Sequence, residues 1–321
     1  MPQGRRRRIL YSTMDMKRVQ QKLQPVLFLI FLLCILLFTA PIVPIASMER
    51  SAEEAPPELA ILRSAYPDVL FSSYYDEEVG DWRITVQSDG RVSELYYAGG
   101  RFLKEEHLSD REKYRVLIYP FRERVTDPET MTPEEIEWFS RFGATENRRT
   151  APVSADDFFD AIYDIGSREA IERNLERVTF LGYAFRIHRL IAEPLARVEK
   201  KVRGLSAEDP AIAEYISQLG SGDGYQWRQI RDTGGRSFHS MGLAIDLLPK
   251  NYHSKTIYWL WEKNAGNDRW MLIPLDQRWM PPGPVVDAFE SEGFIWGGKW
   301  PVWDNMHFEY RPELLHARDE Q

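Results

Sequence analysis

Two short stretches near the C-terminal end of the chain contain the residue types that bind metal ions and act on water. Residues 237–246 read Ser-Phe-His-Ser-Met-Gly-Leu-Ala-Ile-Asp, and residues 303–309 read Trp-Asp-Asn-Met-His-Phe-Glu. Catalytic Zn²⁺ takes three protein ligands from His, Asp or Glu and leaves a fourth position for water. Two histidines, a carboxylate to complete the ligand set and a second carboxylate close to the water therefore predict a catalytic metal site.

The first stretch has the alternation of a β-strand. From Gly242 to Leu248, small or acidic residues alternate with large apolar ones, so that one face enters the core and the other lines a site. Asp246 is expected on the site face, where Ala244 beside it leaves room for an ion. Gly242 permits the turn that brings His239 back over the same face.

The second stretch predicts another strand with two different faces. Phe308 and Tyr310 point one way, while His307 and Glu309 point the other. Asp304, three residues before His307, is expected at the start of this strand. We expect Glu309 to accept the free ring N–H of a ligand histidine, with a surface carboxylate as the alternative.

Together the two stretches form a pattern, S-x-H-x-x-G-x-A-x-D followed by D-x-x-H-F-E, that resembles the zinc D-alanyl-D-alanine carboxypeptidase family. This family also includes the vancomycin-resistance D,D-peptidases and the phage and bacterial L-alanyl-D-glutamate endopeptidases. The run Gly-Phe-Ile-Trp-Gly-Gly-Lys-Trp at 293–300 is similar to the family as well. The resemblance covers roughly residues 180–315.

By this resemblance, His239, Asp246 and His307 bind one Zn²⁺ ion and Asp304 is the general base. Such a metal lowers the pKa of its bound water towards roughly 7 and polarises the scissile carbonyl. Asp304 takes the proton from that water and passes it to the leaving amine. The implied reaction is metal-assisted peptide hydrolysis.

Family members similarly place an arginine upstream of the first motif, where it binds a substrate carboxylate or carbonyl. Arg228 is the best positional match, with Arg236 second. A planar guanidinium suits bidentate capture of a carboxylate, which would turn the scissile bond towards the metal. A surface arginine in a loop is the alternative. Ser237 is expected either to hydrogen-bond a ligand or the substrate, or to be a turn residue only.

Peptidoglycan stem peptides are the substrates that the resemblance implies. An aspartate at the base position followed by His-Phe-Glu is more similar to the L-alanyl-D-glutamate endopeptidases, whereas the D,D-carboxypeptidases usually have a glutamate there. Both bonds remain open as the site of cleavage. A second class also remains open, a catalytically silent zinc-binding cell-wall or signalling module. A general protease is disfavoured because the chain contains no H-E-x-x-H motif.

The N-terminal segment and the body of the chain have opposite charge. Residues 1–50 carry eight Lys/Arg and two acids, a net of +6, so the formal charge of −8 leaves −14 for the rest. An acidic body without a basic stripe argues against nucleic acid as a partner. The 43% of apolar residues support a sizeable core, and the single cysteine, Cys34, allows no disulfide framework and no cysteine metal site.

Residues 25–46 are almost wholly apolar and long enough to span a bilayer. The basic segment 1–24 before them predicts a cytoplasmic N-terminus and an exported body. We therefore expect residues 25–47 to be a transmembrane anchor or a signal peptide, with membrane contact through residues 25–46. The chain would then be anchored in, or secreted into, the bacterial cell envelope, with its catalytic domain outside the cytoplasmic membrane.

Three regions are expected after this segment: a linker over 48–65, a β-rich N-terminal region over 66–150 and the zinc peptidase domain over 151–321. In the β-rich region, two strands are predicted on either side of a Ser-Asp-Gly turn at 88–90, and 114–121 predicts a further strand. This region is expected to be a spacer or packing subdomain, with a wall- or partner-binding module as the alternative.

Helical signals follow. Thr-Pro-Glu-Glu at 132–135 is a capping box that predicts a helix to about Phe142. Apolar residues at helical spacing from Val178 to Leu195 predict another helix, with His188 packed on its apolar face. Residues 205–225 read as turn-rich. The expected fold is α+β, with helices on one face of a small antiparallel sheet and a zinc groove across it, preceded by the β-rich region and the transmembrane segment.

Overall fold

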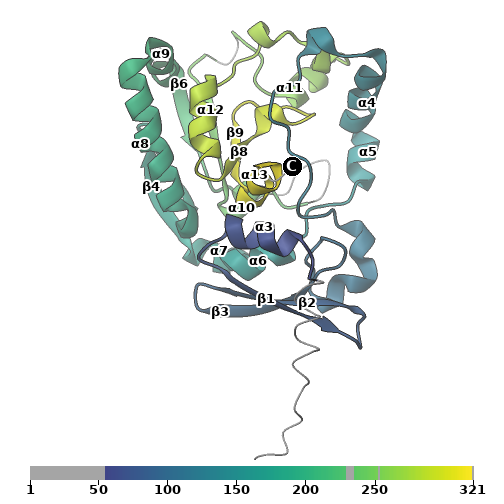
Figure 1. Cartoon of the computed structure of the whole chain (residues 1–321). Coiled ribbons are helices and arrows are strands. Elements are labelled where there is room, and N and C mark those ends of the chain that lie inside the picture. The colour runs from purple at the N-terminus through teal and green to yellow at the C-terminus, as the bar shows by residue number, and fades with distance from the viewer. Residues whose placement is uncertain (1–54, 229–234, 252–253, 320–321) are drawn as a thin grey trace, which may run out of the picture. The chain divides into compact units, whose positions relative to one another are not determined.

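The structure is a computed structural model that describes residues 55–228, 235–251 and 254–319. Its central sheet is antiparallel, with the strand order β6-β7-β9-β8 (Figure 1). Asp246 pairs with His307, and Ala244 pairs with Glu309, so these four side chains share one face of the sheet. The strands are β6 (Leu219–Asp223), β7 (Ala244–Pro249), β8 (Phe294–Trp296) and β9 (His307–Tyr310).

The opposite face of this sheet is apolar and covered by helices. Ile245 and Phe308 pair there, and the Phe308 ring stacks on Phe289 of α12 with 3.8 Å between centroids. Figure 1 shows α12 (Gly283–Glu290) between the strands β8 and β9 and the long α8 (Ala192–Glu208). The predicted α+β class with a small antiparallel sheet is confirmed.

A β-hairpin and a short 3-10 turn precede α8, so the helix predicted from Val178 to Leu195 is wrong over residues 178–191. β4 (Leu175–Phe180) and β5 (Tyr183–His188) pair antiparallel. Leu181 and Gly182 between them have φ of 49° and 95°, the left-handed pair that closes a two-residue hairpin. The helix begins only at Ala192, with Pro194 in its first turn, where proline is tolerated.

The N-terminal part of the described chain is α3 (Glu58–Ala65) and a three-stranded antiparallel meander. The predicted turn at 88–90 is confirmed, since Asp89 and Gly90 both have positive φ. The strand predicted at 114–121 is wrong, because the N–H groups of Arg115 and Leu117 donate to two unrelated segments. The meander strands are β1 (Leu70–Asp76), β2 (Asp81–Ser88) and β3 (Arg91–Tyr96).

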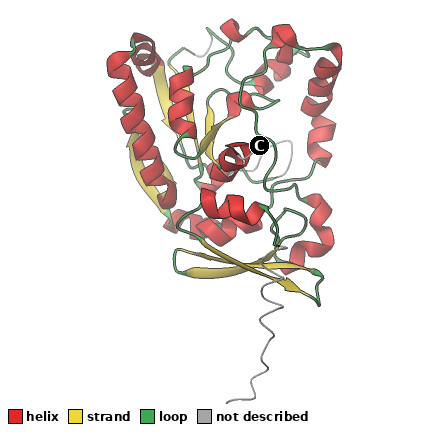
Figure 2. Cartoon of the chain, in the orientation of Figure 1, coloured by secondary structure: helices red, strands yellow, loops and turns green. Residues whose placement is uncertain are grey.

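The meander and the central sheet are built on one hydrophobic core. Buried side chains from Leu59 of α3 and Ile84 of β2 to Phe289 and Phe308 belong to a single cluster. Two neighbours on α6 (Asp156–Tyr163) connect the two parts: the Phe158 ring lies 5.8 Å from that of Tyr66, and the Phe159 ring lies 5.0 Å from that of Phe238. The strands form three sheets, and Figure 2 shows the meander at the bottom of the view, apart from the other strands.

The predicted capping box is present: Thr132 accepts a hydrogen bond from the N–H of Glu135 at 3.2 Å and its own N–H donates to the Glu135 carboxylate at 2.8 Å. Residues 205–225 are not turn-rich, because they form the end of α8, then α9 and β6. The glycines of β6 instead serve close packing, since a Cβ on Gly222 would lie 3.1 Å from the Phe185 ring.

The remaining α-helices are α4 (Pro133–Gly143), α5 (Thr145–Thr150), α6 (Asp156–Tyr163), α7 (Arg168–Arg173), α9 (Pro210–Gln218), α10 (Phe238–Met241), α11 (Trp259–Asn264) and α13 (Pro312–Asp319). The short 3-10 helices are η1 (Glu105–Lys113), η2 (Pro128–Thr130), η3 (Arg189–Ile191), η4 (Trp270–Leu272), η5 (Leu275–Gln277) and η6 (Gly297–Lys299).

Within the described ranges, none of the helices has both the length and the apolar character needed to cross a membrane. The predicted basic segment 1–24 and membrane segment 25–46 lie outside the described residues.

Candidate metal centre

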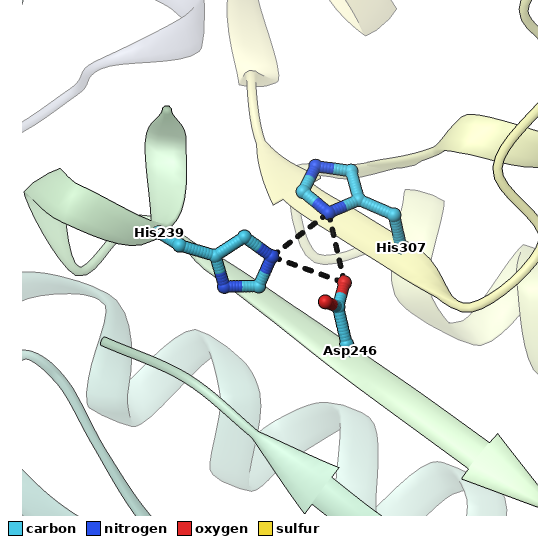
Figure 3. Close-up of side chains that lie close together, drawn as sticks. All are labelled: His239, Asp246 and His307. Atoms are coloured by element: carbon cyan, nitrogen blue, oxygen red, sulfur yellow. Dashed lines mark hydrogen bonds and ion pairs between the residues drawn. The ribbon is translucent and has the colours of Figure 1, made fainter. Parts of the chain in front are cut away.

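Three side chains from different parts of the chain meet at one point of the sheet (Figure 3). His239 Nε2 lies 3.0 Å from Asp246 Oδ1 and 3.1 Å from His307 Nδ1, and His307 Nδ1 lies 3.0 Å from Asp246 Oδ1. All three residues are buried. The structure thus brings the three predicted ligands into one group that could hold a metal ion, the His–Asp–His cluster.

The short helix α10 (Phe238–Met241) brings His239 over β7. It ends at Gly242, which has a φ of 73° and whose N–H bonds the carbonyl of His239. A Cβ on Gly242 would lie 2.8 Å from the backbone nitrogen of His188. The left-handed φ and the close approach both require glycine, so the turn predicted at Gly242 is present.

The outer nitrogen of each cluster histidine has an acceptor that fixes the tautomer. His239 Nδ1 lies 2.7 Å from the carbonyl oxygen of Gly224, and His307 Nε2 lies 3.2 Å from Glu309 Oε2. A carbonyl and a carboxylate can only accept, so both outer nitrogens carry the proton. In the neutral rings, the inner nitrogens therefore point lone pairs at each other and at Asp246.

Three converging lone pairs repel unless a proton or a cation lies between them. Burial opposes charge on His307, but hydrogen bonds and charges of Asp246 and Glu309 raise its pKa to about 10. Burial would raise the pKa of Asp246, yet both histidines hold it well below its usual range. A proton can thus occupy the point of convergence, and a metal ion would displace it. Two imidazoles and one carboxylate are a donor set that fits Zn²⁺.

Asp304 lies beside the cluster, three residues before the first residue of β9. Its Oδ1 atom is buried and has no hydrogen-bond partner within the described part of the chain. Burial raises the pKa of Asp304 to about 7, although the charges of His307 and Arg228 oppose the shift. An orphaned carboxylate oxygen with a pKa near neutrality is suited to exchange a proton with a water or substrate held in the cluster.

The Trp-Gly-Gly run before β9 places Asp304. The N–H of Asp304 donates to the carbonyl of Gly297 at 3.0 Å. A Cβ on Gly297 would lie 2.7 Å from the Asp304 carbonyl oxygen, and one on Gly298 would lie 2.2 Å from the Trp296 ring. Both glycines are therefore needed for this close packing.

The two candidate arginines have separate environments. Arg228 Nη2 lies 4.0 Å from Asp246 Oδ2, with its side chain half exposed at 50%. Arg236 instead donates to Asp156 Oδ2 at 3.2 Å and to the carbonyl of Ile165 at 2.9 Å, which anchors it to α6 and the loop after it. The structure therefore brings Arg228, and not the guanidinium of Arg236, to the cluster.

Three other residues singled out from the sequence, Ser237, Glu309 and His188, are all buried. Ser237 is buried directly before α10, and its carbonyl accepts hydrogen bonds from Ser240. Glu309 is buried, and its Oε2 atom lies 3.2 Å from His307 Nε2. His188 is a packed histidine, as predicted: it is buried, and its Nε2 lies 2.8 Å from the carbonyl oxygen of Tyr163.

Sequence reasoning missed Gly224 and Arg311. Gly224 contributes a backbone carbonyl, and a Cβ there would lie 2.3 Å from the carbonyl oxygen of Arg186. Its signal was the glycine-rich run 220–224, which was interpreted as a turn. Arg311 contacts Glu309 with its Nη1 atom at 3.4 Å. The alternation of Glu309, Arg311 and Glu313 after the second motif was the signal for this buried pairing.

Comparison with known proteins is consistent with this geometry. Residues 231–310 match the family model of D-alanyl-D-alanine carboxypeptidase, and this segment contains the whole His–Asp–His cluster. The match supports a peptidase of this family. Residues 58–119 match the model of a domain of unknown function. No solved structure matches the chain.

Proposed function

We propose that the chain is a zinc peptidase that hydrolyses peptidoglycan stem peptides. The observation that carries the proposal is the convergence of His239 Nε2, Asp246 Oδ1 and His307 Nδ1, with an unpartnered oxygen of Asp304 beside them. The family match over 231–310 supports the same class of activity.

In this proposal His239, Asp246 and His307 hold the metal, and Asp304 is the general base. A bound Zn²⁺ supplies an acidified water and polarises the scissile carbonyl. Asp304 accepts a proton from the attacking water and delivers it to the leaving amine, which suits a carboxylate whose pKa is raised to about 7. Burial around the cluster keeps bulk water away from this exchange.

Arg228 is proposed to hold the substrate. Its guanidinium is half exposed and lies 4.0 Å from Asp246, so it can reach a substrate carboxylate or carbonyl at the mouth of the cluster. The scissile bond is either the D-alanyl-D-alanine bond or the L-alanyl-D-glutamate bond. We place the activity in the bacterial cell envelope, with membrane contact through residues 25–46, because the substrate lies outside the cytoplasmic membrane.

Mass spectrometry of stem pentapeptides incubated with the zinc-loaded chain tests the proposal, with His239→Ala as the control. Release of a terminal D-alanine would identify a carboxypeptidase, and a cut between L-alanine and D-glutamate an endopeptidase. Intact peptides in the presence of bound zinc would contradict the proposed reaction. That result would favour a zinc-binding wall module without hydrolytic activity.

A further inference from the structure

A chain of buried charged and polar side chains begins at His307 and ends in the N-terminal part of the molecule. Glu309 Oε2 lies 3.2 Å from His307 Nε2, and Glu309 Oε1 accepts a hydrogen bond from Arg311 Nη1 at 3.4 Å. Arg311 also donates through Nε to Glu313, and the Tyr66 hydroxyl donates to the other oxygen of Glu313 at 2.6 Å. All five residues are buried.

Arg311 is held from several sides. Its Nη2 donates to the carbonyl of Leu117 at 3.1 Å. Its guanidinium carbon lies 5.5 Å from the ring of Tyr119, 5.3 Å from that of Phe159 and 5.1 Å from that of Phe238. Phe238 is the residue before the first cluster histidine. Arg311 therefore contacts the elements that carry both cluster histidines.

The N-terminal region supplies two of the polar groups that complete this chain. Tyr66 follows α3, which packs against α13, the helix that carries Glu313. Tyr66 and Leu117 both lie within the segment 58–119 that matches a domain of unknown function. Ions buried in a low-dielectric interior keep their geometry only while every partner is present. Removing the Tyr66 hydroxyl frees one oxygen of Glu313, and the change passes through Arg311 to Glu309.

We propose that Tyr66 is a positioning residue for the metal centre. Through Glu313, Arg311 and Glu309 it holds the imidazole of His307 in the orientation that faces Asp246 and His239. The N-terminal region is then an integral part of the metal site and not a detachable spacer. This inference rests on the proposed function in one respect, namely that His307 binds a metal ion.

The test compares Tyr66→Phe with Tyr97→Phe in the full chain. Tyr97 also donates its hydroxyl to a glutamate of the N-terminal region, Glu58, at 2.9 Å. Among the described residues, no hydrogen bond or ion pair joins Glu58 to His239, Asp246 or His307. Titration with Co²⁺, followed by visible absorption, gives the metal affinity without substrate. We expect Tyr66→Phe to weaken Co²⁺ binding about threefold to tenfold. A loss of about tenfold to hundredfold is typical when a residue that bonds a metal ligand directly is changed, and Tyr66 is further away. Tyr97→Phe should leave the affinity within about twofold of the unchanged chain.

The thermal midpoint of the metal-free variants separates positioning from folding. A lower midpoint in Tyr66→Phe with unchanged Co²⁺ affinity would overturn the proposal, and so would equal losses of affinity in both variants. If Tyr66→Phe does not fold, Glu313→Gln tests the same chain and should weaken Co²⁺ binding at least as much. Co²⁺ binding by the unchanged chain without peptide cleavage would refute the proposed reaction and leave this test valid, whereas no Co²⁺ binding would refute both.

Discussion

Two adjacent stretches of the chain differ in how their buried polar groups are satisfied. In residues 300–305, the ring N–H groups of Trp300 and Trp303, Asp304 Oδ1 and the Asn305 amide are buried without a hydrogen-bond partner from the described residues. In residues 307–313, by contrast, the side chains of His307, Glu309, Arg311 and Glu313 each bond at least one other charged or polar group.

This difference distinguishes a reacting stretch, residues 300–305, from a supporting stretch, residues 307–313. A buried polar group without a partner costs about 1–3 kcal/mol, so a set of them is retained where water or a ligand supplies the partners. Residues 300–305 also lie beside the cluster, since the Trp300 ring is 5.3 Å from that of His307. A fully paired buried network instead fixes geometry. We therefore expect changes in 300–305 to alter turnover, and changes in 307–313 to alter stability and metal affinity.

Arg311→Met should have the largest effect on stability. Without the guanidinium, Glu309 and Glu313 remain buried without their cation, which costs about 3–5 kcal/mol. Urea unfolding of the metal-free chain measures this loss. Arg197→Met is the matched control, because Arg197 is half exposed in its ion pairs with Glu193 and Glu292, and such pairs contribute about 0–1 kcal/mol. Equal losses of unfolding free energy in both variants would contradict the assignment of residues 307–313 as the supporting stretch.

His188 extends the comparison to a buried, fully paired histidine whose ring bonds Tyr163 and Leu190 and no residue of the cluster. Burial lowers its pKa to about 4, so between pH 6.5 and 4 the unfolded chain binds a proton that the folded chain does not. Stability therefore falls as the pH falls through this range, by at most about 3 kcal/mol from this residue. His188→Gln should flatten the dependence of the urea midpoint on pH without changing Co²⁺ affinity. An equally steep profile in the variant would contradict this assignment.

Gly224→Ala should weaken metal binding about tenfold to a hundredfold, because the added methyl group displaces the carbonyl that fixes the His239 tautomer. Co²⁺ titration measures the loss. Gly204→Ala is the control, since Gly204 lies in α8 with nothing within 4 Å of an added Cβ. Unchanged affinity in Gly224→Ala would show that the tautomer of His239 does not depend on this carbonyl.

Gly297→Ala should lower kcat roughly tenfold with zinc retained, because the added methyl group displaces Asp304, the proposed general base. Stem-peptide turnover and zinc content are measured on the same sample. Gly283→Ala, at an open position on α12, should change neither. Loss of zinc in Gly297→Ala would show that residues 300–305 belong to the supporting stretch and not to the reacting stretch.

The sequence predicted the His–Asp–His cluster through the resemblance of its two motifs to a zinc peptidase family. The alternation around Asp246 and His307, which lie in short strands, is also visible locally, whereas His239 lies in the short helix α10. It ranked Arg228 above Arg236 by position only. It could not predict the contact that holds Arg236, since Asp156 is distant in the chain. Gly224 was missed because it acts through its carbonyl, which no side-chain pattern reveals. The bond between Tyr66 and Glu313 joins residues 247 positions apart, so no local pattern predicts it.

Local sequence patterns also led to two errors in the predicted fold. The apolar residues from Val178 to Phe185 fit a helical period, and the structure forms a hairpin there because Leu181 and Gly182 adopt a left-handed turn. The aromatic residues around that turn favour a strand, and this signal should have decided between the two. The strand predicted at 114–121 failed for another reason, since its partners Gly100 and Val153 come from separate segments.

The central claim is that Asp304 acts on the substrate while its buried neighbours hold the metal. The most direct test is zinc content and stem-peptide turnover of Asp304→Asn, which keeps the shape of the side chain and removes the base. We predict that the variant keeps its zinc and loses about 10²- to 10⁴-fold in kcat. Undiminished turnover with zinc bound would contradict the claim.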